Sequence, residues 1–239
     1  MDQNNYMHTY VSVDCVVFGF DGDKLNLLLV KRNGSSVVES EFKLPGSIIY
    51  QEEDTDQAAE RVLHELTGLK TIKLKQFKCF SSINRASDPA DQQWLAEEYG
   101  PRMERLITVA YLALTKIGRK LQVVPKYEKA QWRSISEITK MPFDHNLIVK
   151  ESLEEIRNWI VAEPALLFEL LPSKFTASEL RRLYAAIYRK NFDVRNFHKK
   201  IAAMEYVTPL SEHQEGVSHR AARYYKFDKV VYNKRKTTL

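Results

Sequence analysis

Apolar and polar residues alternate along the first two-thirds of the chain in a way that predicts a mixed α/β domain. Residues 11–20 and 25–32 are two runs rich in Val, Leu and Phe, and they flank the turn Asp21-Gly22-Asp23, which predicts a β-hairpin. The segment 42–46 is a short extended piece that Pro45-Gly46 interrupts. Further strands are expected at residues 74–83, 106–115, 121–125 and 130–133.

Two helices are expected in the same part of the chain. Asp54 or Thr55 is suited to cap a helix that runs to Thr67 and ends at Gly68. Its apolar residues follow the helical period: Ala58, Ala59, Val62, Leu63 and Leu66. A second helix is expected over residues 144–161, with an apolar face of Leu147, Leu153, Ile156 and Ile160. The polar stretch 84–104, with Pro89, Gly100 and Pro101, indicates a long loop.

The last third of the chain has a different pattern. A short apolar helix is expected at residues 164–171, and Thr176 with Glu179 has the spacing of a capping box that opens a second helix. The apolar face of that second helix comprises Leu180, Leu183, Tyr184 and Ile187. Asp193 is a suitable cap for a third helix, which would bury Val194, Phe197, Ile201 and Met204. Two strands, at 206–210 and 222–227, complete the order of a winged helix-turn-helix.

The charge divides along the same line. The whole chain has a net charge of +5, but residues 164–239 hold 15 Lys/Arg against 7 Asp/Glu, a net of +8, and the remainder has a net of −3. A basic module joined to an acidic one indicates a polyanionic partner, most often a nucleic acid. The alternative is a basic tail that is merely solvated. We therefore predict two domains, residues 1–160 and 161–239.

Composition excludes several other classes of protein. The chain has 239 residues, 44% of them hydrophobic, and no uninterrupted apolar run approaches the roughly 18–20 residues that span a bilayer. The first ten residues do not resemble a secretory signal, so we expect a cytoplasmic protein. The two cysteines, Cys15 and Cys79, lie in apolar strand-like segments and are expected to be reduced core thiols. They cannot form a zinc site, and we predict no metal or cofactor.

The segment from Leu44 to Leu69 resembles the Nudix box, a loop and helix that cleave diphosphates in that family. The spacing is kept, with Ser47 at the position of the glycine, Glu53 at the first glutamate, Arg61 at the arginine, and Gly68-Leu69 at the end. In the family, three carboxylates on one face of the helix hold a divalent metal that activates water. Those positions are Val62, Glu65 and Leu66 here.

One carboxylate cannot replace three, because Mg²⁺ requires several hard oxygen ligands. We therefore expect a Nudix-like fold without catalytic residues, retained for binding, in which Glu65 is solvated or paired with Arg61. The alternative is an active Nudix pyrophosphatase on substrates of the ADP-ribose type.

The exposed face of the third C-terminal helix is suited to the major groove of DNA. Arg195 can pair with guanine and Asn196 with adenine, whereas Lys199 and Lys200 would hold phosphates. We also assign Lys174, and His219 with Arg220 in the predicted wing, to DNA binding. His198 and His213 have no metal-ligand spacing and are expected to be surface residues. The alternative is a helical partner domain whose lysines are solvated.

The two halves together resemble the Nudix-related transcriptional regulators. The resemblance rests on the altered Nudix box, on Phe143-Asp144-His145, and on the segments 171–176, 195–200 and 219–227. It implies an N-terminal Nudix-like effector domain, a C-terminal winged helix, and a homodimer on palindromic operator DNA. Branches of this family respond to ADP-ribose-type ligands in NAD metabolism or to sugars such as L-arabinose. We expect the arabinose-responsive branch, with ADP-ribose sensing as the alternative.

An uncharged pentose needs a small pocket with a few hydrogen-bonding groups and an aromatic wall. The candidates are Asp14, Lys43 and Arg105, with Tyr50 as the wall. The sequence does not identify the operator, the dimer interface, or whether the effector releases or promotes DNA binding.

Overall fold

The computed structural model describes residues 9–32, 41–70, 72–101, 105–117, 130–216 and 221–238. The chain divides into two compact units. The first comprises residues 1–18, 26–114 and 118–155, and the second comprises residues 19–25, 115–117 and 156–239. Each unit is described by itself below.

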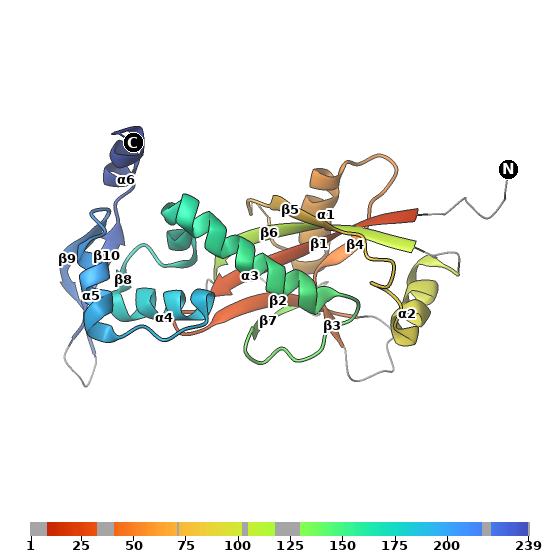
Figure 1. The fold of residues 1–239 in the computed structure, drawn as a ribbon, viewed down its shortest axis with the longest axis horizontal. Helices are drawn as coiled ribbons and strands as arrows, with labels where there is room; N and C mark the ends of the chain where they lie inside the picture. The colour runs from red at the N-terminus through yellow and green to blue at the C-terminus, as the bar shows by residue number, and fades with distance from the viewer. Residues whose placement is uncertain are drawn as a thin grey trace. The chain divides into compact units, whose positions relative to one another are not determined.

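The first unit is built on one sheet with the strand order β3-β2-β1-β6-β5, in which β4 also pairs with β1 and β7 with β2 (Figure 1). The pairs β1–β4, β2–β3, β2–β7 and β5–β6 are antiparallel. The strands are β1 (Thr9–Phe20), β2 (Leu25–Lys31), β3 (Phe42–Lys43), β4 (Gly46–Ile48), β5 (Lys75–Phe80), β6 (Arg105–Lys116) and β7 (Ala130–Ser134). The predicted hairpin is confirmed as β1 and β2. The strand predicted at 121–125 lies outside the described residues.

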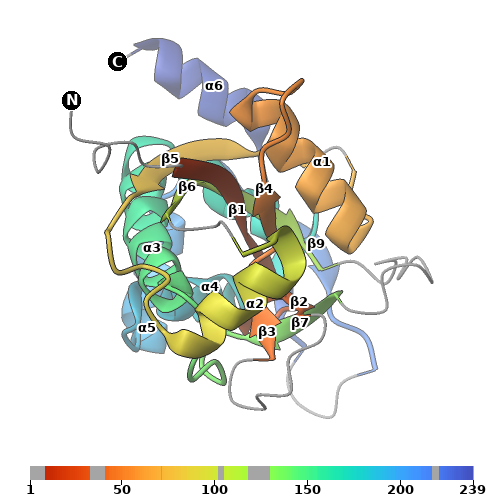
Figure 2. The ribbon, with the colours of Figure 1, turned by 90° about the vertical axis from the view of Figure 1, so that its right-hand side faces the viewer.

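Helices α1 (Thr55–Thr67) and α3 (His145–Ala162) lie on opposite sides of the strands (Figure 2). Side chains of α1, from Ala58 to Leu63, form one core cluster with Val13, Cys15 and Val17 of β1. Successive side chains of a strand point to opposite faces. Ser12 and Asp14 therefore belong to the face that is turned away from α1, and this fact positions the pocket described below.

The predicted caps of α1 are confirmed. The Asp54 side chain accepts a hydrogen bond from Gln57 N at 2.8 Å, and the Gln57 side chain accepts one from Asp54 N at 3.0 Å. The helix ends at Gly68, whose left-handed φ of 73° favours glycine.

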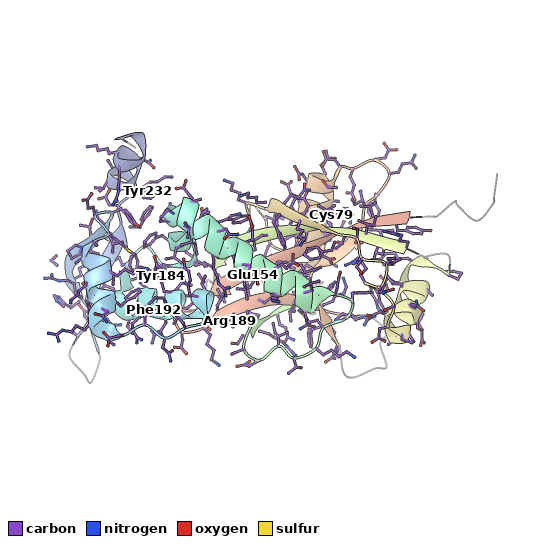
Figure 3. All side chains as sticks on the ribbon, viewed as in Figure 1. Cys79, Glu154, Tyr184, Arg189, Phe192 and Tyr232 are labelled. Carbon is purple, nitrogen blue, oxygen red and sulfur yellow. The ribbon has the colours of Figure 1, made fainter. Side chains whose placement is uncertain are left out.

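Three expectations for this unit are wrong. The predicted loop at 84–104 contains helix α2 (Pro89–Tyr99), which Asp88 caps and which buries Trp94 and Leu95. Leu147 is 45% exposed, because the apolar stripe of α3 begins one residue later, at Ile148. Cys79 is exposed, because β5 is an edge strand of the sheet (Figure 3), whereas Cys15 is buried as predicted.

The second unit contains the winged helix arrangement. A 3-10 helix, η4 (Pro164–Leu170), precedes α4 (Ala177–Tyr188) and α5 (Val194–Ala202), and a small sheet has the order β8-β10-β9. Its strands are β8 (Phe175–Thr176), β9 (Val207–His213) and β10 (Arg223–Phe227), and a last helix, α6 (Lys229–Thr238), follows. Neither β8 nor α6 was predicted.

Aromatic rings hold α4 and α5 together (Figure 3). Tyr184 of α4 contacts the rings of Phe192 and Phe197, with centroids 5.9 and 5.4 Å apart. The predicted capping box of α4 and the Asp193 cap of α5 are both present. Val194 is 55% exposed rather than buried, because it is the first residue of α5, one turn ahead of Phe197. Within the described parts of the chain, no helix has the length and apolar character needed to cross a membrane.

Candidate effector pocket and nucleic-acid interface

The loop and helix that resemble the Nudix box keep their structural scaffold. Arg61 on α1 donates from Nε to Glu53 Oε2 at 2.8 Å and from Nη2 to the Ile48 carbonyl at 3.1 Å. Glu53 in turn accepts a hydrogen bond from Tyr50 N at 2.8 Å. The hydrogen bond and charge of Arg61 lower the pKa of Glu53, although burial opposes this effect. The pair therefore closes the loop onto the helix.

The positions that hold metal in the Nudix family do not fit Mg²⁺ here. Val62 is fully buried in the core, and Leu66 packs against the same cluster, so neither offers an oxygen. Glu65 is half exposed and pairs with Arg61 at 3.2 Å, as the sequence predicts. Among the described residues, His, Cys, Asp and Glu form no group of three that could bind a metal. This helix face therefore offers one carboxylate, already paired with an arginine, which is too few hard ligands for Mg²⁺.

A pocket opens on the sheet face that is turned away from the α1 core. About 330 Å³ of space lies within and in front of it, part of which is open solvent. Its polar walls come from β1, the β3–β4 segment, the start of α3 and the loop before α2, and its aromatic walls come from α2. The lining residues are Ser12, Asp14, Lys43, Gly46, Ser47, Ile48, Arg85, Trp94, Leu95, Tyr99, Leu106, Phe143 and His145.

Two of the four predicted effector residues lie in this pocket. Asp14 and Lys43 are both buried there, and Lys43 Nζ donates to the Gly46 carbonyl at 2.6 Å. Tyr50 and Arg105 do not line it. Tyr50 is 53% exposed, with the guanidinium of Arg61 3.8 Å from its ring centre. Arg105 donates instead to the Ser81 carbonyl.

Asp14 lies at the centre of a buried network of charged groups. Arg85 Nη2 is 3.4 Å from Asp14 Oδ2 and 2.9 Å from Asp144 Oδ1, and His145 Nε2 is 3.5 Å from Asp14 Oδ1. Burial opposes the charged form of Asp14, but His145, Arg85 and Lys43 outweigh it, so the pKa of Asp14 lies below its usual range. Burial also lowers the pKa of Lys43.

His145 is neutral in this environment, because burial lowers its pKa to about 4. Leu44 N donates to its Nδ1 at 3.2 Å, which leaves the ring proton on Nε2, toward Asp14. Arg85 thus contacts the carboxylates of both Asp14 and Asp144, and the charge of Lys43 also acts on Asp14.

Two buried arginines beside the pocket retain donors that make no hydrogen bond within the described structure. Arg85, which lines the pocket, has such a donor at Nη1, and Arg32 has two, Nε and Nη2. Arg32 pairs with Asp91 at 2.9 Å, and its guanidinium lies 4.7 Å from the ring centre of Trp94. Buried donors without acceptors are costly, so the Arg85 donor favours a ligand that supplies oxygen atoms.

Sequence reasoning missed most of the pocket. The sequence pattern does not mark the rings of Trp94 and Tyr99, because it indicates a loop where their helix α2 lies. Arg85 lies in that same stretch, and no local pattern marks it. Phe143 and His145 had carried a signal, since they belong to the segment 143–145 on which the family resemblance rests.

The α5 side chains that the sequence assigns to DNA binding lie at the surface of the second unit. Arg195, Asn196, Lys199 and Lys200 are exposed, while Phe197 and Ile201 on the other side of the helix are buried. Lys200 is the exception in this group, since its Nζ lies 4.4 Å from the ring centre of Tyr184 and burial lowers its pKa. Three of these side chains are therefore exposed to solvent, and the fourth packs on the ring of Tyr184.

A hollow runs between α5, the start of α4 and the strands β9 and β10. Its walls include Ser178, His198, His213, Arg223 and Tyr225. His198 and His213 are exposed, as expected of surface residues. Lys174 pairs with Glu212 of β9 at 2.5 Å, so its charge is partly neutralised. His219 and Arg220, assigned to the wing, lie outside the described residues.

Comparison with known proteins finds relatives of both parts of the chain. Residues 167–227 match the family model described as the NrtR DNA-binding winged helix domain. An ADPR responsive transcriptional repressor NtrR of Acinetobacter baylyi is 25% identical over 229 residues, which cover 94% of this chain and 84% of the relative. An ADP-ribose pyrophosphatase of Methanocaldococcus jannaschii is 25% identical over 146 residues, which cover 61% of this chain and 74% of that enzyme.

Solved structures show the same fold. The crystal structure of Shewanella oneidensis NrtR complexed with a 27mer DNA has a TM-score of 0.66 and 19% identity, covering 91% of this chain and 93% of that one. A MutT/nudix family protein from Enterococcus faecalis has a TM-score of 0.63 and 22% identity. The match covers 95% of this chain and 89% of that one. The predicted fold class is therefore confirmed: a Nudix-like α/β domain is followed by a C-terminal winged helix.

Proposed function

We propose that this chain is a transcriptional repressor that binds operator DNA through its winged helix and senses a small effector in its Nudix-like domain. The observation that carries the proposal is the match of residues 167–227 to a DNA-binding winged helix family, combined with the exposed Arg195, Asn196 and Lys199 on α5. The relative over 94% of the chain is itself named a transcriptional repressor. A homodimer would place two copies of α5 on two half-sites about one helical turn apart.

The effector we propose first is a nucleotide of the ADP-ribose type. The Acinetobacter relative is named for its response to this ligand, and the Methanocaldococcus relative is named for hydrolysing it. The predicted link to the arabinose-responsive branch finds no support in these names. ADP-ribose sensing, the alternative drawn from the sequence, therefore becomes the leading hypothesis.

We propose a small neutral sugar as the second candidate, because the pocket chemistry favours it. Arg85 already contacts the carboxylates of Asp14 and Asp144, and the buried Asp14 carboxylate lines the pocket, so a diphosphate would bring further negative charge beside a buried carboxylate. Hydroxyl groups would satisfy the buried Arg85 donor at no such cost. The rings of Trp94 and Tyr99 would supply the aromatic wall.

We further propose that the domain binds its effector without hydrolysing it. Val62 and Leu66 lack the oxygens that Mg²⁺ requires, and Glu65 pairs with Arg61. Purified protein should therefore not turn over ADP-ribose with Mg²⁺. Turnover that Glu65→Gln abolishes would instead establish the pyrophosphatase.

The test of the regulator is a gel shift on the DNA upstream of the chain's own gene neighbours, with ADP-ribose or L-arabinose added. Binding to one fragment, and its change by one ligand, is the expected result. Indifference to every fragment would contradict the proposal.

The effector is identified separately by thermal unfolding, because a ligand that binds the folded state raises the melting temperature. Tyr99→Phe should reduce the shift of a ligand held in the pocket, since Tyr99 lines it. Tyr50→Phe is the matched control and should leave the shift unchanged, because Tyr50 lies outside the pocket. Equal effects of both variants would mean that the effector binds elsewhere.

A further inference from the structure

The C-terminal helix α6 has a charge pattern that the proposed function does not yet use. Residues 229–238 contain four Lys or Arg and no Asp or Glu. Lys229, Lys234 and Arg235 are exposed. The helix begins beyond residue 227, where the match to the winged helix family ends.

This basic helix is fixed to the winged helix unit. Asp228 N donates to the Tyr206 carbonyl at 2.8 Å, and the Asp228 carboxylate accepts from Val230 N and Val231 N, each at 3.1 Å. Tyr232, buried where α6 meets the strands (Figure 3), donates its hydroxyl proton to Glu163. Its ring also lies against those of Tyr206 and Phe227, with centroids 5.3 and 5.5 Å apart.

The anchoring means that the α6 cations move with the recognition helix rather than as a loose tail. Both α5 and α6 belong to the same compact unit, and α6 continues directly from β10 (Figure 1). Aromatic packing at Tyr232 and the cap at Asp228 pre-organise the helix, which reduces the entropy lost on binding.

We propose that α6 is a second DNA-binding element, which holds the phosphate backbone of the duplex that α5 reads. This inference rests on the proposed function, because it takes the partner of α5 to be DNA. Duplex DNA has one negative charge per roughly 1.7 Å of its axis, so a helix about 15 Å long with only basic charges meets several phosphates. Contacts to phosphates hold the duplex without reading its sequence.

The experiment compares two variants that lose the same charge. The α6 variant replaces Lys229, Lys234 and Arg235 by Gln, and the control replaces Lys73, Lys140 and Lys150 of the first unit, which are also exposed. Each lowers the net charge by three. Operator affinity is measured between 50 and 200 mM salt by fluorescence anisotropy, on the full-length chain, with circular dichroism and melting temperature to verify folding.

The α6 variant should weaken operator binding by about eightfold per lost phosphate contact at 0.1 M salt, and reduce the slope of log K against log salt by about 0.9 per contact. A scrambled duplex should be weakened by the same factor, so the preference for the operator is kept. The control variant should change both quantities by much less.

Three results separate the possible failures. If the wild-type chain binds no DNA, the proposed function fails and this inference fails with it. If the wild-type binds and both variants keep its slope, only the role of α6 is overturned. If the α6 variant keeps the slope but loses a dimer by light scattering, the helix binds a second copy of the chain instead, which also overturns the inference.

Discussion

At the scale of single residues, the pocket depends on a neutral histidine held beside a charged aspartate. His145 accepts from Leu44 N and faces Asp14 Oδ1, and it is almost fully excluded from solvent. Its protonation would place a third cation among Lys43 and Arg85 in a buried space. The fold therefore favours the unprotonated ring.

This arrangement predicts a loss of stability in mild acid. The pKa of His145 is about 4 in the folded chain, against roughly 6.5 when unfolded, so the unfolded state binds the extra proton between these values. The contribution of neutral His145 to the stability of the fold is complete above pH 6.5. It is lost as the pH falls toward 4. The free energy of unfolding, measured by urea titration, should fall by about 2 kcal/mol from pH 7 to pH 5 through this residue.

The His145→Gln variant removes the titrating group and should flatten this part of the pH profile. The variant is also less stable at pH 7, because Leu44 N loses its acceptor. The comparison therefore uses the pH dependence and not the absolute stability. Parallel loss of stability in both proteins would show that His145 is not the cause.

The second prediction at this scale concerns Gly46, where the structure leaves no room for a side chain. A Cβ at this position would lie 2.0 Å from Asp14 Oδ1 and 2.8 Å from the Val13 carbonyl. Gly46→Ala should destabilise the chain by about 1–3 kcal/mol in urea unfolding. Ser47→Ala, the neighbouring control, adds no atom and should cost about 1 kcal/mol or less. An Ala at position 46 that costs no more than the control would contradict the close approach.

The sequence predicts residues of the candidate site only where a charged residue interrupts an apolar segment. Asp14 and Lys43 are charged residues in or beside apolar strands, so the pattern alone marked them, and both line the pocket. Arg85 and Trp94 come from a polar stretch and approach Asp14 and Lys43 only through the tertiary fold. The ring of Tyr50 lies against Arg61 and does not line this pocket, so the pattern of the sequence does not separate it from the lining residues.

At the scale of elements, hydrophobic period and caps predicted α1, α3, α4 and α5 well, since each begins at a capping residue or carries a clear apolar stripe. The sequence pattern does not predict helix α2, because its few apolar residues are spread around the helix and form no stripe. The signal that could have found it is Asp88-Pro89, a cap followed by proline in the first turn. The sequence pattern does not predict helix α6 either, because its buried side consists mainly of one side chain, Tyr232.

Two substitutions on helix α5 should distinguish contacts to the bases of DNA from contacts to its phosphates. Arg195→Ala should relax the preference for the base at one operator position, at a cost of about 1–3 kcal/mol. Lys199→Ala should weaken all sequences alike and reduce the salt slope by about 1. Both side chains are exposed on the same helix, so each serves as the control for the other. Binding measured on an operator and on single-base variants distinguishes them, and identical profiles would mean that α5 does not read bases.

At the scale of the whole molecule, the chain joins an acidic part, residues 1–163, to a basic part, residues 164–239, with net charges of −3 and +8. A repressor of this design works only if the effector and the DNA favour different states of the chain. The coupling is then reciprocal: if the effector weakens operator binding by a given factor, the operator weakens effector binding by the same factor. This equality follows from thermodynamics and needs no assumption about how the domains move.

The expected factor is about 5–150, which corresponds to roughly 1–3 kcal/mol of coupling. Calorimetry would measure the affinity of the active ligand, ADP-ribose or arabinose, with the free chain and with the chain saturated by operator duplex. Anisotropy would measure operator affinity with and without that ligand, in the same salt. A scrambled duplex is the control. It makes fewer sequence-specific contacts with the chain, so its binding should change the affinity for the ligand less. Two unequal factors would mean that the ligand acts on some other equilibrium, such as dimer formation, and equal factors near one would mean that this chain is not controlled by the ligand.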